Sequence, residues 1–204
     1  MHYNSRLFAG LLLAAGLAAL VLRGTAAGPG RRWLVIALAG ATALLPSTFF
    51  AAAEAGIPFV EVGQENYDSH GDNFVVHKAN MQCLDPAWSA LLTDLAESGQ
   101  LDDTLVIWMG EVGRTPQINN RAGRDHFISA WTVVLSGGGV KGGQIYGASD
   151  ADGKTVKDSP VSEGDLFATI YRALGINYRA KHHAGVRPVW LTPEGAKPID
   201  ALLG

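Results

Sequence analysis

From residue 54 onward the sequence predicts an α/β fold, in which strands and helices alternate along the chain. A short apolar run at residues 58–62 and a β-branched and aromatic run at residues 104–109 are typical of buried strands. Between them, residues 85–99 show apolar side chains at helical spacing. A strand, a helix and a strand in this order imply a parallel pair of strands joined by a right-handed crossover.

The helix between these strands has recognisable ends. Asp85 is a suitable N-cap, and Pro86 fits the first helical turn, where no partner is needed for an N–H group. Gly99 can end the helix. The apolar stripe along it comprises Trp88, Leu91, Leu92 and Leu95. We expect this stripe to pack on the sheet.

A third strand and a second helix follow. Residues 131–135 are a strand candidate, and residues 163–174 are a helix candidate. Ser162 and Asp165 have the spacing of a capping box, and Gly175 can close the helix. The side chains expected to face inward are Leu166, Phe167, Ile170 and Leu174. The proline-rich tail beyond this helix should be irregular.

Residues 1–53 differ from the rest, and we expect one or two apolar helices ahead of the α/β domain at residues 54–204. Two runs, at residues 7–22 and 33–53, carry no charged side chain. In one interpretation they form a transmembrane hairpin whose arginine-bearing loop stays in the cytoplasm. In another, the second run is a signal-like stretch. Both make the domain membrane-associated or exported to the periplasmic side, whereas a third interpretation makes the runs core helices of a soluble protein.

The charge balance and the cysteine content exclude several classes of protein. A net charge of -3 and a pI near 6.0 provide no basic stripe to neutralise phosphates, so a nucleic-acid partner is not expected. The single cysteine, Cys83, excludes an internal disulfide framework and a cysteine-rich zinc site. Cys83 itself is expected to be a small buried hydrophobe.

Acidic and imidazole side chains occur at three places, each beside a predicted strand. Asp68 and His70 follow the first strand, Glu111 follows the second, and His126 precedes the third. Side chains at strand ends can meet at one edge of a sheet. Imidazole and carboxylate groups are zinc ligands, and a catalytic zinc keeps one position open. We therefore expect Asp68, His70 and His126 to hold one ion.

Each of these residues also has a simpler interpretation. Asp68 and His70 could belong to a solvated turn, and Glu111 could form a salt bridge with Arg114. Asp125 could serve to orient the imidazole of the adjacent His126. These alternatives remain open at the level of the sequence.

Two further patterns are set aside. Residues 137–142 fit the spacing G-x-G-x-x-G after a strand. The residues that follow do not begin a helix, however, and the phosphates of a nucleotide bind at a helix N-terminus. His182 and His183 lie in a polar tail beside Lys181 and are expected to face solvent.

Five phrases of the sequence carry a resemblance to a known family. They are DSHGDN at residues 68–73, LDDTLVIWMGEVGRTP at 101–116, GRDHF at 123–127, VVLSGGGVKGGQIYGASDADG at 133–153 and DLFATIYRALGI at 165–176. These phrases resemble the C-terminal part of the bacterial domain-of-unknown-function family 1501, whose members resemble sulfatases and group with the alkaline phosphatase superfamily. The resemblance implies a partial doubly wound, mostly parallel sheet with two divalent metals at the C-terminal strand edge.

By analogy with that superfamily, Asp68, His70 and His126 would occupy a three-ligand metal position, and Glu111 would stand where a second-site acid is expected. The chain departs from the pattern at Val112, where phosphatases carry a histidine. It also has two apolar runs where relatives have a long N-terminal half that supplies the hydroxyl nucleophile. The resemblance therefore covers an incomplete, truncated domain.

Two functions follow from these observations. The first is a metal-dependent hydrolase of phosphate or sulfate esters, with zinc, or alternatively manganese or calcium, acting on a small anionic ester. Glu111 and Arg114 are its candidate catalytic residues, and Arg114 would clamp the anion. The second is a catalytically inactive, membrane-tethered or fragmentary family member that acts as a binding or structural module.

Overall fold

A four-stranded sheet forms the middle of the fold in the computed structural model, which describes residues 33–37 and 57–204. The strand order is β2-β1-β3-β6. Strand β1 (Trp33–Ala37) pairs in parallel with β2 (Phe59–Val62) and with β3 (Thr104–Trp108). The edge strand β6 (Val134–Ser136) pairs antiparallel to β3. The three strands predicted from the sequence are present, and the third begins at Val134 and not at residue 131.

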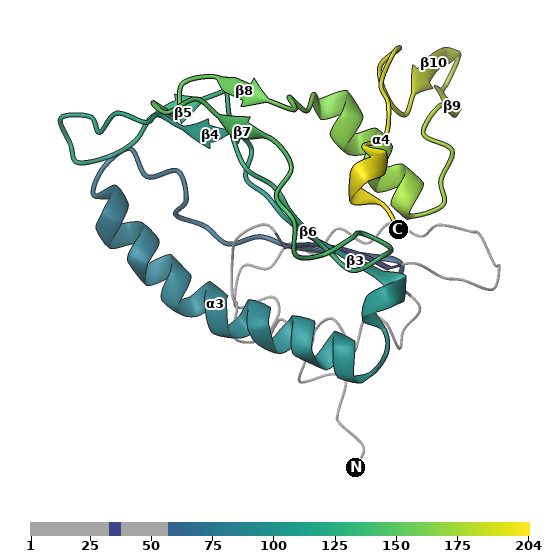
Figure 1. The fold of residues 1–204 in the computed structure, drawn as a ribbon, viewed down its shortest axis with the longest axis horizontal. Helices are drawn as coiled ribbons and strands as arrows, with labels where there is room; N and C mark the ends of the chain where they lie inside the picture. The colour runs from purple at the N-terminus through teal and green to yellow at the C-terminus, as the bar shows by residue number, and fades with distance from the viewer. Residues whose placement is uncertain (1–32, 38–56) are drawn as a thin grey trace.

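Helix α3 (Asn73–Glu97) covers one face of this sheet (Figure 1). Leu91 and Leu95 of the helix are fully buried and pack in one cluster with Val106 of β3. Burial of each such leucine is worth roughly 1.5–3 kcal/mol. The predicted stripe therefore packs on the sheet, with Trp88 and Leu92 half-buried beside it.

The predicted start of this helix at Asp85 was wrong, because α3 begins at Asn73 and contains Pro86 in its interior. A proline inside a helix removes one hydrogen bond and is a common signal of a helix start. Here the buried face continues on both sides of the proline, with Leu84 before it and Ala87 after it. Packing along the sheet outweighs the local signal.

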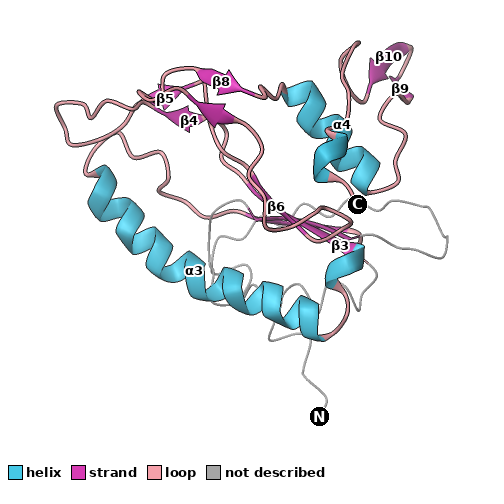
Figure 2. Ribbon diagram, viewed as in Figure 1, coloured by secondary structure: helices cyan, strands magenta, loops and turns pink. Residues whose placement is uncertain are grey.

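Helix α4 (Glu163–Ala173) covers the opposite face of the sheet (Figure 2). Leu166 and Ile170 pack with Leu105 and Ile107 of β3. Because successive side chains of a strand point to opposite faces, β3 supplies both layers of the core. The doubly wound sulfatase type of sheet stays a prediction.

The ends of α4 agree with the sequence. The Ser162 side chain accepts a hydrogen bond from the backbone N–H of Asp165, so the predicted cap is confirmed. Gly175 follows the helix with a φ of 71°. Phe167, which we expected to face inward, is 43% exposed. It lies one position past the buried Leu166, on the solvent side of the helix.

Of the predicted apolar N-terminal segment, the structure describes only strand β1. Residues 33–37 were expected to be part of an apolar helix, and that expectation was wrong because they form a strand. A central strand of a parallel sheet is a continuous apolar run, which periodicity cannot distinguish from a buried helix. The remaining residues of the apolar segment lie outside the described residues. Among the helices of the described part, none is both long and apolar enough to span a membrane.

Short strand pairs and 3-10 turns complete the fold. The predicted irregular tail contains a hairpin of β9 (Lys181–Ala184) and β10 (Arg187–Trp190), so that prediction was wrong. A second small pair joins β7 (Ala148–Ser149) to β8 (Val156–Asp158). Single 3-10 turns are η2 (Leu101–Asp103) and η3 (Asp200–Leu202).

Two other expectations have clear outcomes. Cys83 is exposed on α3, so its predicted burial was wrong. It lies beside the buried Leu84 on a helix whose opposite face meets the sheet. The glycine-rich segment at residues 137–142 opens no helix, as the sequence indicated, and its Gly138 N–H donates to the carbonyl of Leu101.

Candidate metal centre

The predicted site residues come from segments that leave the sheet at one edge. Strands β2 and β3 are both parallel to β1, so their carboxyl ends lie at the same edge, followed by Asp68 and His70 after β2 and by Glu111 after β3. Strand β6 is antiparallel, so its beginning lies at this edge. His126 precedes β6 and for this reason reaches the same place.

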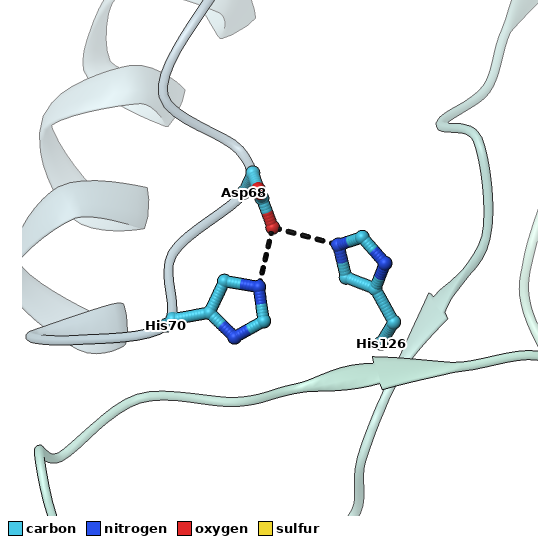
Figure 3. Close-up of side chains that lie close together, drawn as sticks. All are labelled: Asp68, His70 and His126. Atoms are coloured by element: carbon cyan, nitrogen blue, oxygen red, sulfur yellow. Dashed lines mark hydrogen bonds and ion pairs between the residues drawn. The ribbon is translucent and has the colours of Figure 1, made fainter.

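Two of these side chains, those of His70 and His126, converge on one carboxylate oxygen of Asp68 (Figure 3). Asp68 Oδ1 lies 3.0 Å from His70 Nε2 and 2.8 Å from His126 Nε2. One ligand atom from each residue lies within 4.8 Å of the others, and the ring centroids of the two histidines are 5.1 Å apart. The aspartate and His126 are exposed, and His70 is half-buried. The cluster is thus open to solvent on one side.

A short hairpin fixes His126 relative to Arg114. Strand β4 (Gly113–Arg114) pairs antiparallel to β5 (His126–Phe127), with Arg114 directly opposite His126. Side chains opposite one another in an antiparallel pair point to the same face. The hairpin therefore presents a guanidinium and an imidazole together to Asp68.

Arg114 joins the two acids of the site. Its Nη1 donates to Asp68 Oδ1 at 2.6 Å, and its Nη2 donates to Glu111 Oε1 at 2.8 Å. The salt bridge between Glu111 and Arg114 that the sequence left open is thus present. Glu111 Oε1 lies 3.6 Å from His126 Nε2, at the margin of the three-residue cluster.

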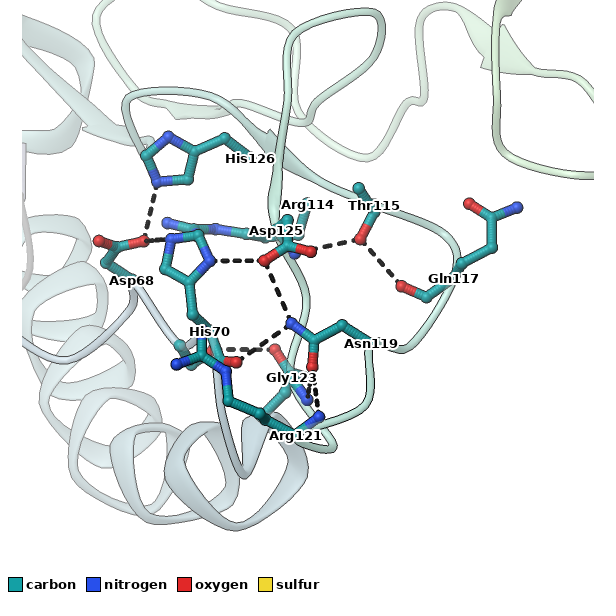
Figure 4. A network of polar contacts seen from close by, with 12 residues as sticks. Asp68, His70, Arg114, Thr115, Gln117, Asn119, Arg121, Gly123, Asp125 and His126 are labelled. Carbon is teal, nitrogen blue, oxygen red and sulfur yellow. Dashed lines mark hydrogen bonds and ion pairs between the residues drawn. The ribbon is translucent and has the colours of Figure 1, made fainter.

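Asp125 orients a histidine, but not the one next to it in the sequence (Figure 4). Its Oδ1 lies 2.6 Å from His70 Nδ1 and also accepts a hydrogen bond from Asn119 at 3.1 Å. The expected partner was His126, which adjoins it in the chain. Because neighbouring residues point in opposite directions in an extended segment, Asp125 and His126 reach different partners.

The loop that carries Asp125 is fastened to the segment that carries His70. The Asn119 side chain donates to the carbonyl of His70 at 3.1 Å, and the Arg124 N–H donates to the carbonyl of Ser69 at 3.1 Å. Gly123 is buried in the contact, where a Cβ atom would lie 2.1 Å from the carbonyl carbon of His70. Asn119 and Gly123 were not among the predicted site residues. The one signal in the sequence was that Gly123 begins the phrase GRDHF and that Asn119 lies four residues before it.

The comparison with family models decides the family. The model described as a protein of unknown function (DUF1501) matches residues 46–203. The chain belongs to the DUF1501 family. Neither the curated proteins nor the solved structures contain a significant match. The matched region of this DUF1501 chain includes every residue of the candidate site.

The electrostatics of the DUF1501 site favour ionised carboxylates. Hydrogen bonds from Arg114 and His126 hold the pKa of Asp68 at about 2, below its ordinary value. The hydrogen bond with His70, followed by that from Asn119, lowers the pKa of Asp125. Both groups are therefore anionic at neutral pH, which is the form that binds a cation.

Proposed function

We propose that Asp68, His70 and His126 hold a divalent metal, with zinc the foremost candidate, in a hydrolase of phosphate or sulfate esters. The observation that carries the proposal is the arrangement of His70. One ring nitrogen lies 2.6 Å from the Asp125 carboxylate, and the other lies 3.0 Å from Asp68 Oδ1 in the centre of the cluster. Histidines that bind metals usually have their second nitrogen held by such an oxygen.

The three ligand atoms, all within 4.8 Å of one another, lie close to the spacing found around a zinc ion. At zinc–ligand bonds of about 2.0–2.1 Å, the ligand atoms of a tetrahedral site lie roughly 3.3 Å apart. The two histidine nitrogens lie 3.0 and 2.8 Å from Asp68 Oδ1, so small side-chain shifts would open the cluster to that spacing. Manganese and calcium remain alternatives, although two imidazoles among three ligands favour zinc.

The balance of charge also supports a dication. The connected side chains Asp68, Glu111 and Asp125 are carboxylates, and Arg114 is the guanidinium that pairs with the first two. With both histidines neutral, this group carries two net negative charges, which a divalent ion would balance. Carboxylates held close together repel one another, and a nearby positive charge offsets that cost.

The chain's own residues suggest how an ester would be handled. When bound, the ion would supply Lewis acidity toward an ester oxygen. Arg114 donates one N–H group to each of the two acids. A guanidinium has five N–H donors, so further ones can bind an anionic ester oxygen. Glu111 is exposed beside His126, where it is suited to moving a proton to or from a reacting group.

One observation favours the alternative of an inactive binding or structural module. The Asp68 carboxylate already has a guanidinium partner at 2.6 Å, so the cluster is compatible with a self-sufficient ion pair. The hydrolase requires a bound metal, whereas a self-sufficient ion pair requires none, so metal content distinguishes the two functions.

The test is metal content in the full chain. We expect about one equivalent of zinc to survive dialysis and be lost in His70→Ala and His126→Ala. His182→Ala is the matched control, because His182 is exposed on β9, outside the cluster. Parallel loading with manganese and calcium identifies the preferred ion, and hydrolysis of p-nitrophenyl phosphate and p-nitrophenyl sulfate separates the substrate classes. A folded wild-type protein that retains none of these metals would refute the proposal.

A further inference from the structure

The residue between two of the proposed ligands points away from the site. Ser69 separates Asp68 from His70 and is only 5% exposed, whereas Asp68 is exposed. The backbone turns tightly here, since the Ser69 N–H donates to the Tyr67 carbonyl at 2.8 Å and the His70 N–H donates to the Asp68 carbonyl at 3.2 Å. In this turn the Ser69 side chain is held inward, while the side chains of Asp68 and His70 meet each other at 3.0 Å and Asp68 reaches His126 at 2.8 Å.

Two residues of the first turns of α3 hold Ser69 in this position. Its hydroxyl donates to Asn73 Oδ1 at 2.9 Å, and its Oγ lies 2.7 Å from His77 Nε2. Asn73 is itself buried, and His77 is half-buried. The ring of Tyr67 packs edge-on against His77, with centroids 5.2 Å apart. The serine is thus bonded to a rigid helix and not to another loop.

The imidazole of His77 is suited to a permanent contact with the serine. Its burial lowers the pKa of His77, which keeps the ring neutral at neutral pH. The positive charges that contribute to this effect belong to Arg114 and Arg124. Because the Ser69 hydroxyl donates its one proton to Asn73, the neutral ring donates from Nε2 to Ser69 Oγ, which requires the tautomer protonated at Nε2.

We propose that Ser69 and His77 form a positioning pair that sets the direction of Asp68 and His70 and thereby the affinity and geometry of the metal site. This inference rests on the proposed function. Ser69 is buried and touches no reacting group, so the pair acts through the ligands on either side of it. The pair complements Asp125, which fixes the ring of His70 from the opposite loop.

The test is titration of the full chain with cobalt(II), whose visible absorption reports both affinity and ligand geometry. Losing a group that orients a ligand typically costs about 10- to 100-fold in metal affinity. We expect that loss, with an altered cobalt spectrum, in Ser69→Ala and His77→Leu. His77→Gln, whose amide reaches the place of Nε2, should keep most of the affinity and the wild-type spectrum.

Leu92→Ala is the control for general destabilisation, because Leu92 packs against the core cluster of α3 and takes no part in the hydrogen bonds of the pair. If Leu92→Ala lowers the unfolding temperature as much as Ser69→Ala does and also weakens cobalt binding as much, the positioning role is overturned. Wild-type affinity and spectrum in Ser69→Ala would also overturn it while leaving the proposed function intact.

A wild-type chain that binds no cobalt would refute the proposed function, and the pair is then tested without metal. The ¹⁵N chemical shifts of the His70 ring report which nitrogen carries the proton. A change of these shifts in Ser69→Ala would support the pair, and unchanged shifts would overturn it.

Discussion

Replacing Gly123 with alanine should separate the two loops that build the metal site. The Cβ of an alanine would lie 2.1 Å from the carbonyl carbon and 2.2 Å from the carbonyl oxygen of His70. The first of these distances must grow to at least 3.4 Å for ordinary contact, a shift of about 1.3 Å. Both obstacles are backbone atoms, so no side-chain rotation can relieve the clash.

The shift would act on the hydrogen bonds that fasten the loops together. The Asn73 N–H donates to the carbonyl of Ala122 at 2.9 Å, and the Asp72 N–H donates to that of Arg121 at 3.0 Å. An opening of that size breaks both bonds and moves Asp125 away from His70. Crowding a well-packed position costs about 1–3 kcal/mol, and displacing a functional group by about 1 Å can cost about 100-fold in function.

The assay is zinc affinity by competition with a chromophoric chelator, together with thermal unfolding. Gly71→Ala is the matched control on the facing loop, since its Cβ would have 3.6 Å to the nearest heavy atom. We expect Gly71→Ala to bind zinc like the wild type and Gly123→Ala to bind about 100-fold more weakly. Equal affinity and equal unfolding temperature for the two variants would refute the steric reasoning.

Three further predictions concern single side chains. Asp125→Asn should weaken zinc binding by about 10- to 100-fold because it removes the charge that orients His70, while the unfolding temperature stays close to that of the wild type; unchanged zinc affinity would count against this role. The pKa of Asp165 is lowered, chiefly by the hydrogen bond from the Lys197 N–H, so its carboxylate stabilises the fold above about pH 4 and this contribution fades as the pH falls further. The difference in unfolding temperature between the wild type and Asp165→Asn should therefore shrink from pH 6 toward pH 3, and a constant difference would contradict the assignment. Cys83 is exposed, so a chromogenic thiol reagent should modify one thiol per native chain, and modification only after unfolding would show that it is covered.

The elements that the sequence predicted well are those with strong local signals. Strand β3 is a β-branched run that ends near a glycine, and α4 begins at a serine that caps it. The start of α3 was missed because Pro86 is a local signal that packing on the sheet overrides. Strand β1 was missed because an apolar run of its kind is equally consistent with a helix.

The candidate site divides in the same way. The grouping of Asp68, His70 and His126 could be predicted, because strand ends that share a sheet edge bring their following residues together. The partner of Asp125 could not be predicted, because it depends on which loop lies opposite. The same holds for Ser69, whose buried contact with His77 joins a loop to a helix.

Asp125 and His126 are adjacent in the chain but serve opposite sides of the site, one bonded to His70 and the other to Asp68. The backbone of Asp125 is also tied to Thr115 at 2.9 Å, so the loop between them is closed at its base. A one-residue insertion or deletion just before Asp125 would exchange the directions of the two side chains and remove an orienting group and a ligand at once. The register at the end of this loop is therefore as much a part of the site as its residues, because a shift of that register changes both roles together.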